Sequence, residues 1–124
     1  MSVPENLAGL AQRIEEYGDV AYLVTVGAEG LPHVVSVRVR WDGAALIAGA
    51  GKRTAANVGH SPDVTLLWPA VPGTGYSLIV DGKAVPSADA AGPTLAIGPV
   101  AAVLHRTPEG DPAGPSCITV LSAA

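Results

Sequence analysis

Apolar residues near the start of the chain recur at the spacing of an amphipathic helix. They follow one another at intervals of three and four residues, at Leu7, Leu10, Ala11 and Ile14. Pro4 stands just before this stretch and Gly18 just after it, and both residue types are typical of the positions that flank a helix. The pattern predicts one helix over residues 5–17 whose apolar side covers one end of the remaining fold.

The middle of the chain carries the alternating pattern of β-strands. Over residues 33–41, one face holds Val35, Val37, Val39 and Trp41, and the other holds Val34, Ser36, Arg38 and Arg40. Glycine-containing turns at residues 27–30 and 42–43 flank this strand and predict hairpins. Further apolar stretches predict strands over residues 20–26, 44–50, 63–68, 76–85, 95–105 and 116–121.

Glycine and proline interrupt two of these strands. Gly82 breaks the stretch over residues 76–85, and Gly98-Pro99 breaks the stretch over residues 95–105. Proline lacks a backbone N–H, so the second interruption predicts a bulge or a sheet edge. Residues 69–75 and 107–115 are expected to be loops, and residues 86–93 are expected only to connect two strands.

A second, shorter helix is expected between the third and fourth strands. It spans residues 51–60, with Thr54 as a candidate N-cap and Ser61-Pro62 as its end. Six or seven short strands with so little helix between them predict an antiparallel sheet that must curl to protect its edges. The expected fold class is therefore mainly β, a small closed barrel with two helices.

Composition favours one folded domain for the 124 residues. Hydrophobic residues make up 48% and charged residues 15%, which excludes the signature of intrinsic disorder. No apolar stretch approaches the roughly 18 residues of a membrane span, and no signal peptide is visible, so a cytoplasmic protein with no membrane partner is expected. The net charge of −4 argues against a nucleic-acid partner. Cys117 is the single cysteine of the sequence, so an internal disulfide is excluded, and it is expected to be a small buried residue.

Basic residues concentrate in one region of this acidic chain. Four of the seven fall within sixteen positions, at Arg38, Arg40, Lys52 and Arg53. Lys52 and Arg53 follow a glycine-rich turn at the expected start of the second helix, where backbone amides and the helix dipole attract anions, and Thr54 adds a hydroxyl. The pattern indicates a phosphate site, and the alternative is four solvated charges. A P-loop is excluded because Leu46 replaces its first glycine and Arg53 separates Lys52 from Thr54.

Motifs for metal binding and for nucleophilic catalysis are absent from the sequence. His33, His60 and His105 lack the short spacings of metal ligands, and no Gly-x-Ser-x-Gly elbow presents a serine. We therefore expect no metal site and identify no catalytic residue, although His33 or Tyr76 is placed to protonate a product if a reaction occurs.

A strand that begins Pro-His, a hairpin, a basic turn and an Ala-x-Asn helix follow one another over residues 31–68. The positions that carry this order are Pro32, His33, Gly51, Arg53, Asn57, Val58, Pro62 and Val64. The order resembles the pyridoxamine 5'-phosphate oxidase-like FMN-binding split barrels, and among them the flavin and deazaflavin oxidoreductases. The resemblance implies one FMN-binding split-barrel domain over residues 1–124, with the deazaflavin coenzyme F-420 as the alternative cofactor.

The resemblance also implies a site. The cofactor-binding residues carried over are Ser36, Val37, Arg38, Arg40, Lys52, Arg53, Thr54 and Asn57. Lys52, Arg53 and Thr54 would hold the phosphate with help from Arg38 or Arg40, and residues 36–38 would face the ring. Trp68 and Tyr76 would line the substrate pocket or a subunit contact, with ordinary core packing as the alternative. The family binds its cofactor at a two-fold interface, so a homodimer is expected.

The implied function is hydride transfer between the bound cofactor and a small conjugated substrate. A non-catalytic protein that binds or stores a flavin or haem is the alternative, and a structural dimer without a ligand is a third. The family has a longer segment where this chain has residues 86–93, which favours the binding protein somewhat. The C-terminus lacks the basic residues of the pyridoxine-phosphate oxidase branch, which argues against vitamin B6 oxidation.

Overall fold

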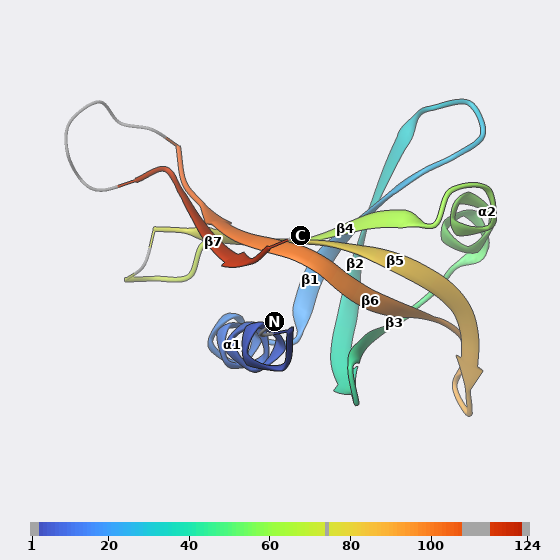
Figure 1. The fold of residues 1–124 in the computed structure, drawn as a ribbon. Coiled ribbons are helices and arrows are strands. Elements are labelled where there is room, and N and C mark those ends of the chain that lie inside the picture. Colours follow the sequence, from blue (N-terminus) through green and yellow to red (C-terminus); the bar gives the residue numbers. More distant parts are fainter. Residues whose placement is uncertain (1–2, 74, 108–114, 123–124) are drawn as a thin grey trace.

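A computed structural model of the protein describes residues 3–73, 75–107 and 115–122. These residues form two helices and seven strands (Figure 1). In chain order they are α1 (Val3–Tyr17), β1 (Val20–Val26), β2 (Pro32–Asp42), β3 (Ala45–Gly49), α2 (Lys52–His60), β4 (Asp63–Trp68), β5 (Ser77–Asp89), β6 (Gly92–His105) and β7 (Cys117–Leu121). In the described part of the chain, no helix is long and apolar enough to cross a membrane.

The strands form one antiparallel sheet that closes on itself. Their order is β3-β2-β1-β4-β5-β6-β7, and β3 also pairs with β6. The long strand β6 makes this possible because its first half pairs with β3, as in Leu46 with Ile97, while its second half pairs with β7, as in Leu104 with Ile118. The result is a closed barrel of six strands with β7 added outside it, which confirms the predicted mainly β, antiparallel barrel with a helix after the third strand.

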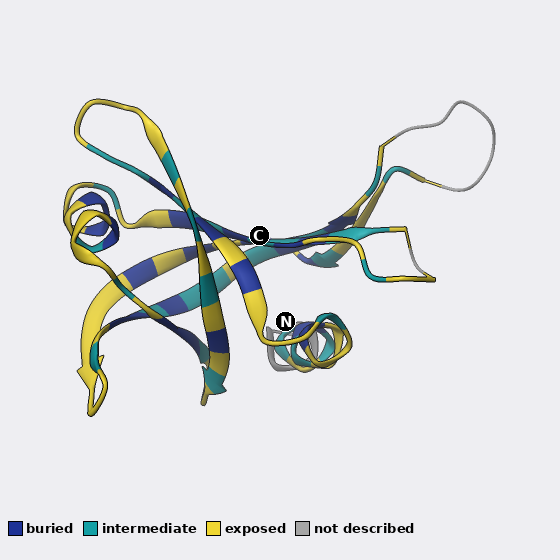
Figure 2. Cartoon of the chain, turned by 180° about the vertical axis from the view of Figure 1, so that it is seen from behind, coloured by how far each residue is buried: buried dark blue, intermediate teal, exposed yellow. Residues whose placement is uncertain are grey.

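Buried residues alternate with more exposed ones along the barrel strands (Figure 2), so every second side chain contributes to the core. Large buried residues come from every barrel strand, among them Leu23, Val39, Leu46, Leu66, Leu78 and Ile97. Helix α1 adds Leu10 and Ile14 to this core, as its apolar spacing predicts. Trp68 is fully buried, and its indole N–H donates to the carbonyl of Gly18 at 2.9 Å, which ties the end of β4 to the turn between α1 and β1.

The largest difference from the sequence prediction lies between β5 and β6. Residues 86–93 were expected only to connect the strands, but they extend both, so that β5 runs to Asp89 and β6 begins at Gly92. The pairing of Pro86 with Leu95 and of Ser87 with Thr94 carries the ladder to this tight turn. Pro86 is the reason that the strand was not predicted, because proline usually argues against a strand. A sheet nevertheless tolerates proline at a position where no backbone N–H is needed for strand pairing.

Cys117 also differs from its expected environment. The sequence places it in an apolar strand and predicted burial, but the thiol-bearing residue is exposed at the start of β7. Because β7 lies outside the barrel and pairs only with β6, its first residues face no core. The loop expected over residues 107–115 lies mostly outside the described residues.

Gly82 and Gly98 meet across a bulge between β5 and β6. The register shifts after Asp81, which pairs with Ala101, whereas Gly82 pairs with Pro99. This confirms the predicted bulge. A Cβ on Gly82 would lie 2.7 Å from the carbonyl oxygen of Gly98, so the two backbones approach too closely for any side chain.

We predict that Gly82→Ala lowers the free energy of unfolding by about 1–3 kcal/mol, because the added methyl group forces the strands apart. The matched control is Gly59→Ala in α2, where a Cβ meets nothing within 4 Å. Alanine favours a helix over glycine, so this control should keep or raise stability by up to about 1 kcal/mol. Urea denaturation followed by tryptophan fluorescence measures both, and equal stability of the two variants would contradict the close approach.

Candidate functional site

The start of α2 and the middle of β2 enclose a cavity of about 550 Å³. We call it the α2 cavity and define it by its lining residues His33, Val35, Ser36, Val37, Arg38, Gly49, Gly51, Lys52, Arg53 and Thr54. Strand β3 ends at Gly49 and α2 begins at Lys52, so two residues, Ala50 and Gly51, bring the chain from the barrel to the helix. The backbone N–H of Ala50 donates to the carbonyl of Pro93 at 3.1 Å and fixes this connection against β6.

Positive charge dominates the lining of the α2 cavity. Arg38, Lys52 and Arg53 all line it, and none of its lining residues carries a carboxylate. Arg38 forms an ion pair with Asp19 from outside the cavity, Nη1 to Oδ2 at 2.9 Å. The side chains of Lys52 and Arg53, in contrast, have neither an ion pair nor a hydrogen bond with any described residue. Both are therefore free to bind an anion.

The first turn of α2 adds backbone donors to this charge. Its N-cap is Gly51, which makes no side-chain capping bond. The first N–H groups of a helix have no partner within the helix, and an uncapped turn presents them to an anion. Thr54 was expected to be the N-cap, but it lies inside the first turn and is 2% exposed. The helix begins earlier than expected because Gly51, whose backbone is extended, is the N-cap three residues before Thr54.

Two predicted cofactor residues lie outside the α2 cavity. Asn57 is buried, and its Nδ2 donates to Oγ1 of Thr25 at 3.0 Å, which fastens α2 to β1. Its amide oxygen would lie 2.6 Å from a Cβ on Gly27, so the β1–β2 turn needs glycine there. Arg40 lies on the same strand face as Arg38 but lines a neighbouring cavity. The structure thus brings together six of the eight predicted residues: Ser36, Val37, Arg38, Lys52, Arg53 and Thr54.

The two aromatic residues expected near the substrate are not in this cavity. Trp68 has no exposed surface, so it does not line a pocket wall as expected. It packs in the core, which was the alternative. Tyr76 precedes β5 at the end of the barrel opposite α2. The first residue of β4, which follows α2, pairs with Lys83, whereas the last residue of β4 pairs with Leu78, close to Tyr76. The hydroxyl of Tyr76 donates to the carbonyl of Pro115 at 2.7 Å, and the Arg106 guanidinium stacks 5.2 Å from its ring centre.

His33 is the residue of the cavity with an unusual polar environment. Its Nδ1 is buried and has no hydrogen-bond partner among the described residues. The sequence identified His33 as part of the Pro-His strand start and as a possible proton donor, and it identified Gly49 as part of the glycine-rich turn, but it did not single out Val35. Val35 could have been found, because it alternates with Val37 along β2. Among the described residues, no three His, Cys, Asp or Glu side chains gather closely enough to hold a metal ion.

Comparison with known structures identifies the architecture. A protein of the pyridoxinephosphate oxidase family from Clostridium acetobutylicum, related to a general stress protein of Bacillus subtilis, superposes with a TM-score of 0.67 at 13% identity over 93% of each chain. An F-420 reductase has a TM-score of 0.56 at 22% identity over 67% of this chain and 87% of its own. A heme storage protein from Vibrio cholerae has a TM-score of 0.58 at 14% identity over 71% and 88%.

Comparison of sequences finds closer relatives. No protein-family model matches the chain. Two proteins described as uncharacterized, one from Mycobacterium bovis and one from Mycobacterium tuberculosis, are each 38% identical to it over 91% of this chain and 89% of their own length. The chain belongs to one family with these mycobacterial proteins, and its fold is the pyridoxamine 5'-phosphate oxidase-like split barrel.

Proposed function

We propose that the α2 cavity binds the phosphate of a flavin-type cofactor and that the protein transfers hydride between this cofactor and a small conjugated substrate. The observation that carries the proposal is the uncapped first turn of α2 beside Lys52 and Arg53, two cations without partners in the described residues. The cavity volume of about 550 Å³ falls within the range of roughly 300–1,000 Å³ typical of small-molecule sites.

The lining residues suit the two ends of such a cofactor. Lys52, Arg53 and the backbone N–H groups of α2 bind the phosphate, since charge-assisted hydrogen bonds are the strongest available to it. Ser36 and Val37 follow along β2 and line the same cavity, where they would lie beside the ring. FMN is the cofactor we propose, with coenzyme F-420 as the alternative, because both combine a planar ring system with a phosphate-bearing tail.

The bound cofactor supplies the hydride chemistry, and the protein supplies binding, orientation and exclusion of water. Apolar Val35 and Val37 cover one side of the cavity. His33 is the proton donor that we propose for the product, because its imidazole lines the same cavity and its Nδ1 has no partner in the described residues. Tyr76 of the same chain does not line this cavity.

A non-catalytic protein that binds or stores a flavin or haem is the second candidate. It is favoured by the tight turn between β5 and β6, since Asp89 pairs directly with Gly92 and no additional segment is available there to cover a substrate. The two functions differ in turnover, whereas both require the α2 cavity. Separate additions of FMN, coenzyme F-420 and haemin, each followed by its absorbance spectrum, identify which molecule binds.

We predict that Arg53→Ala weakens FMN binding about ten- to a hundredfold, because it removes a charge-assisted hydrogen bond worth about 1.5–3 kcal/mol. The affinity of the parent protein should also fall as the salt concentration rises. Quenching of flavin fluorescence during titration measures both effects. Arg13→Ala is the matched control: Arg13 lies on α1, pairs with Glu16 and does not line the α2 cavity, so its loss should leave the affinity unchanged. Equal affinities of parent and Arg53→Ala would place the phosphate elsewhere.

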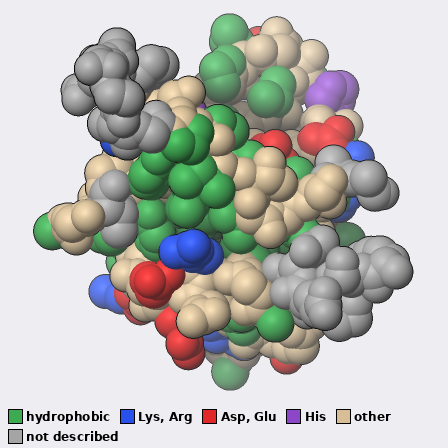
Figure 3. Space-filling model, turned by 60° about the vertical axis from the view of Figure 1, so that its left-hand side comes forward, with side chains coloured by type: hydrophobic (Ala, Val, Ile, Leu, Met, Phe, Trp, Pro, Cys, Tyr) green, Lys and Arg blue, Asp and Glu red, His purple; other side chains and the backbone are tan. Residues whose placement is uncertain are grey.

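We also propose that the protein acts as a homodimer. An apolar row crosses the outside of the barrel, where Tyr22 pairs with Leu67, Leu67 with Ile79, and Ile79 with Val103. Tyr22 is 44% exposed, and no described element covers it. Figure 3, which brings the β7 side of the molecule forward, shows hydrophobic side chains gathered in one continuous area with charged groups at its margin. Such a patch favours association with a second copy.

We predict that Tyr22→Glu shifts the protein from dimer to monomer, because association would then bury an unpaired charge. The matched control is Val85→Glu, which adds the same charge to an exposed apolar residue of β5 outside the row. Sedimentation velocity at micromolar concentration measures both variants. A monomeric parent protein, or a Tyr22→Glu variant that remains dimeric, would contradict the proposed interface.

A further inference from the structure

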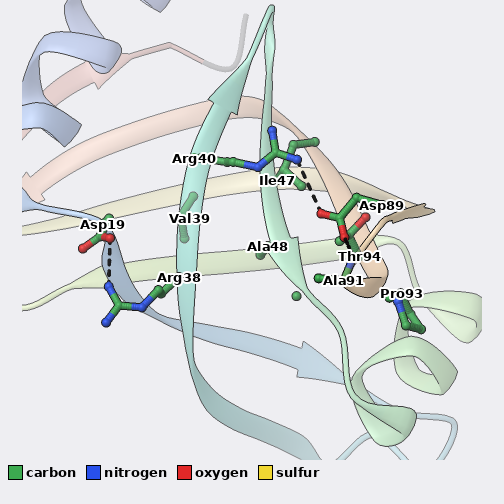
Figure 4. A pocket seen from close by; sticks show the side chains of 12 residues that line it. Asp19, Arg38, Val39, Arg40, Ile47, Ala48, Asp89, Ala91, Pro93 and Thr94 are labelled. Atoms are coloured by element: carbon green, nitrogen blue, oxygen red, sulfur yellow. Dashed lines mark hydrogen bonds and ion pairs between the residues drawn. The ribbon is translucent and has the colours of Figure 1, made fainter.

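A second cavity, which we call the hairpin cavity, lies beside the α2 cavity and is enclosed by β2, β3 and the turn between β5 and β6 (Figure 4). Its volume is about 360 Å³. Val39, Ile47, Ala48 and Pro93 give it an apolar lining, and Arg40 and Asp89 approach one another across it. An apolar cavity with a few convergent polar groups is the usual form of a small-molecule site.

Arg40 has unused hydrogen-bonding capacity in the hairpin cavity. Its Nη2 lies 3.5 Å from Oδ2 of Asp89, and no hydrogen bond joins Arg40 to any described residue. A guanidinium group carries five N–H donors in a planar fork that matches the two oxygens of a carboxylate. One distant carboxylate oxygen therefore leaves most of these donors available to a ligand.

The carboxylates near this cavity are more fully engaged than Arg40. Asp89 accepts the backbone N–H of Ala91 at 2.8 Å through its Oδ1, which holds it in the turn. Asp19 binds Arg38 at 2.9 Å. The hairpin cavity is lined by two basic side chains, Arg38 and Arg40, and by two acidic ones, Asp19 and Asp89. The adjoining α2 cavity adds Lys52 and Arg53 and no acidic side chain, so the charge around the two cavities is positive and favours an anion over a cation as the ligand.

Arg38 and Gly49 line both cavities. A molecule in the hairpin cavity therefore lies next to whatever occupies the β2 end of the α2 cavity. In the proposed function this is the end where the cofactor ring would lie, beside residues 36–38.

We propose that the hairpin cavity binds a small conjugated carboxylic acid, with its carboxylate on Arg40 and its apolar body against Ile47 and Ala48. The identification of this acid as the substrate rests on the proposed function, whereas its binding does not. Arg40 is then the residue that selects for the acid, and Asp89 competes with the ligand for its guanidinium. The contrasting explanation is that the Arg40–Asp89 pair only fastens the β5–β6 turn to β2.

The test compares trans-cinnamate with cinnamamide, which has nearly the same shape and no charge. Titrations of the full chain are followed by the backbone amide signals of residues 45–49, Gly92 and Thr94 in NMR spectra. We expect cinnamate to bind at least about tenfold more tightly than cinnamamide, because only the acid pairs a negatively charged group with two acceptor oxygens against the guanidinium. Arg40→Met keeps an apolar stem without the guanidinium and should abolish this preference. Arg13→Met, which removes a guanidinium outside both cavities, should retain it.

Asp89→Asn tests the competition directly and avoids loss of the arginine. This variant removes the charge that opposes the ligand and keeps the side-chain shape, so it should bind cinnamate severalfold more tightly than the parent. If the Arg40–Asp89 pair only fastened the turn, Asp89→Asn would not raise the affinity for cinnamate. The proposal is overturned if cinnamate and cinnamamide bind equally or not at all, if Arg40→Met retains the preference, or if Asp89→Asn shows no gain.

The same titrations separate this inference from the proposed function. Arg53→Ala should weaken FMN binding and leave the preference for cinnamate intact, because Arg53 lines only the α2 cavity. Absence of FMN, coenzyme F-420 and haem binding together with a preference for cinnamate would reject the cofactor and retain the acid site. FMN binding without a preference for cinnamate would retain the cofactor and reject the acid site.

Discussion

The pairing of β3 with β6 is the constraint on which the rest of the structure depends. It closes the barrel, and it is possible because β6 is long enough to pair with β3 and β7 through different halves. The same pairing fixes where β3 ends, so that α2 begins next to β2. The backbone bond from Ala50 to Pro93 continues this link past the end of β3. The barrel closure therefore positions the candidate site.

A small barrel filled by its own side chains has no room for a ligand inside it. Its sites must form on the outside, where strands, turns and helix ends leave hollows. Both cavities follow this rule, since they share Arg38 and Gly49 and lie on the outside of β2 and the end of β3. The acidic chain concentrates its cations around these hollows, while an apolar row crosses β1, β4, β5 and β6 on the outside of the barrel.

The bonds around α2 show how the core and the site depend on one another. Asn57 joins α2 to Thr25 in the barrel wall, and its amide oxygen lies close against Gly27 in the turn after β1. At the other end of the barrel, Trp68 ties β4 to the turn after α1. A residue that resembles a ligand contact in the sequence thus acts here by holding the element that presents the charges.

The sequence by itself determined the strands, the amphipathic α1, the helix after the third strand and the cluster of basic residues. These features are local, because alternation, helical spacing and glycine at turns depend on near neighbours in the chain. Only the tertiary structure decided that Trp68 is buried, that Cys117 is exposed, that β5 and β6 extend to a tight turn, and that Arg38 lines both cavities whereas Arg40 lines only the hairpin cavity. Each of these depends on which strands become neighbours when the barrel closes. Sequence spacing does not encode that choice, because contacts such as Leu46 with Ile97 join residues far apart in the chain.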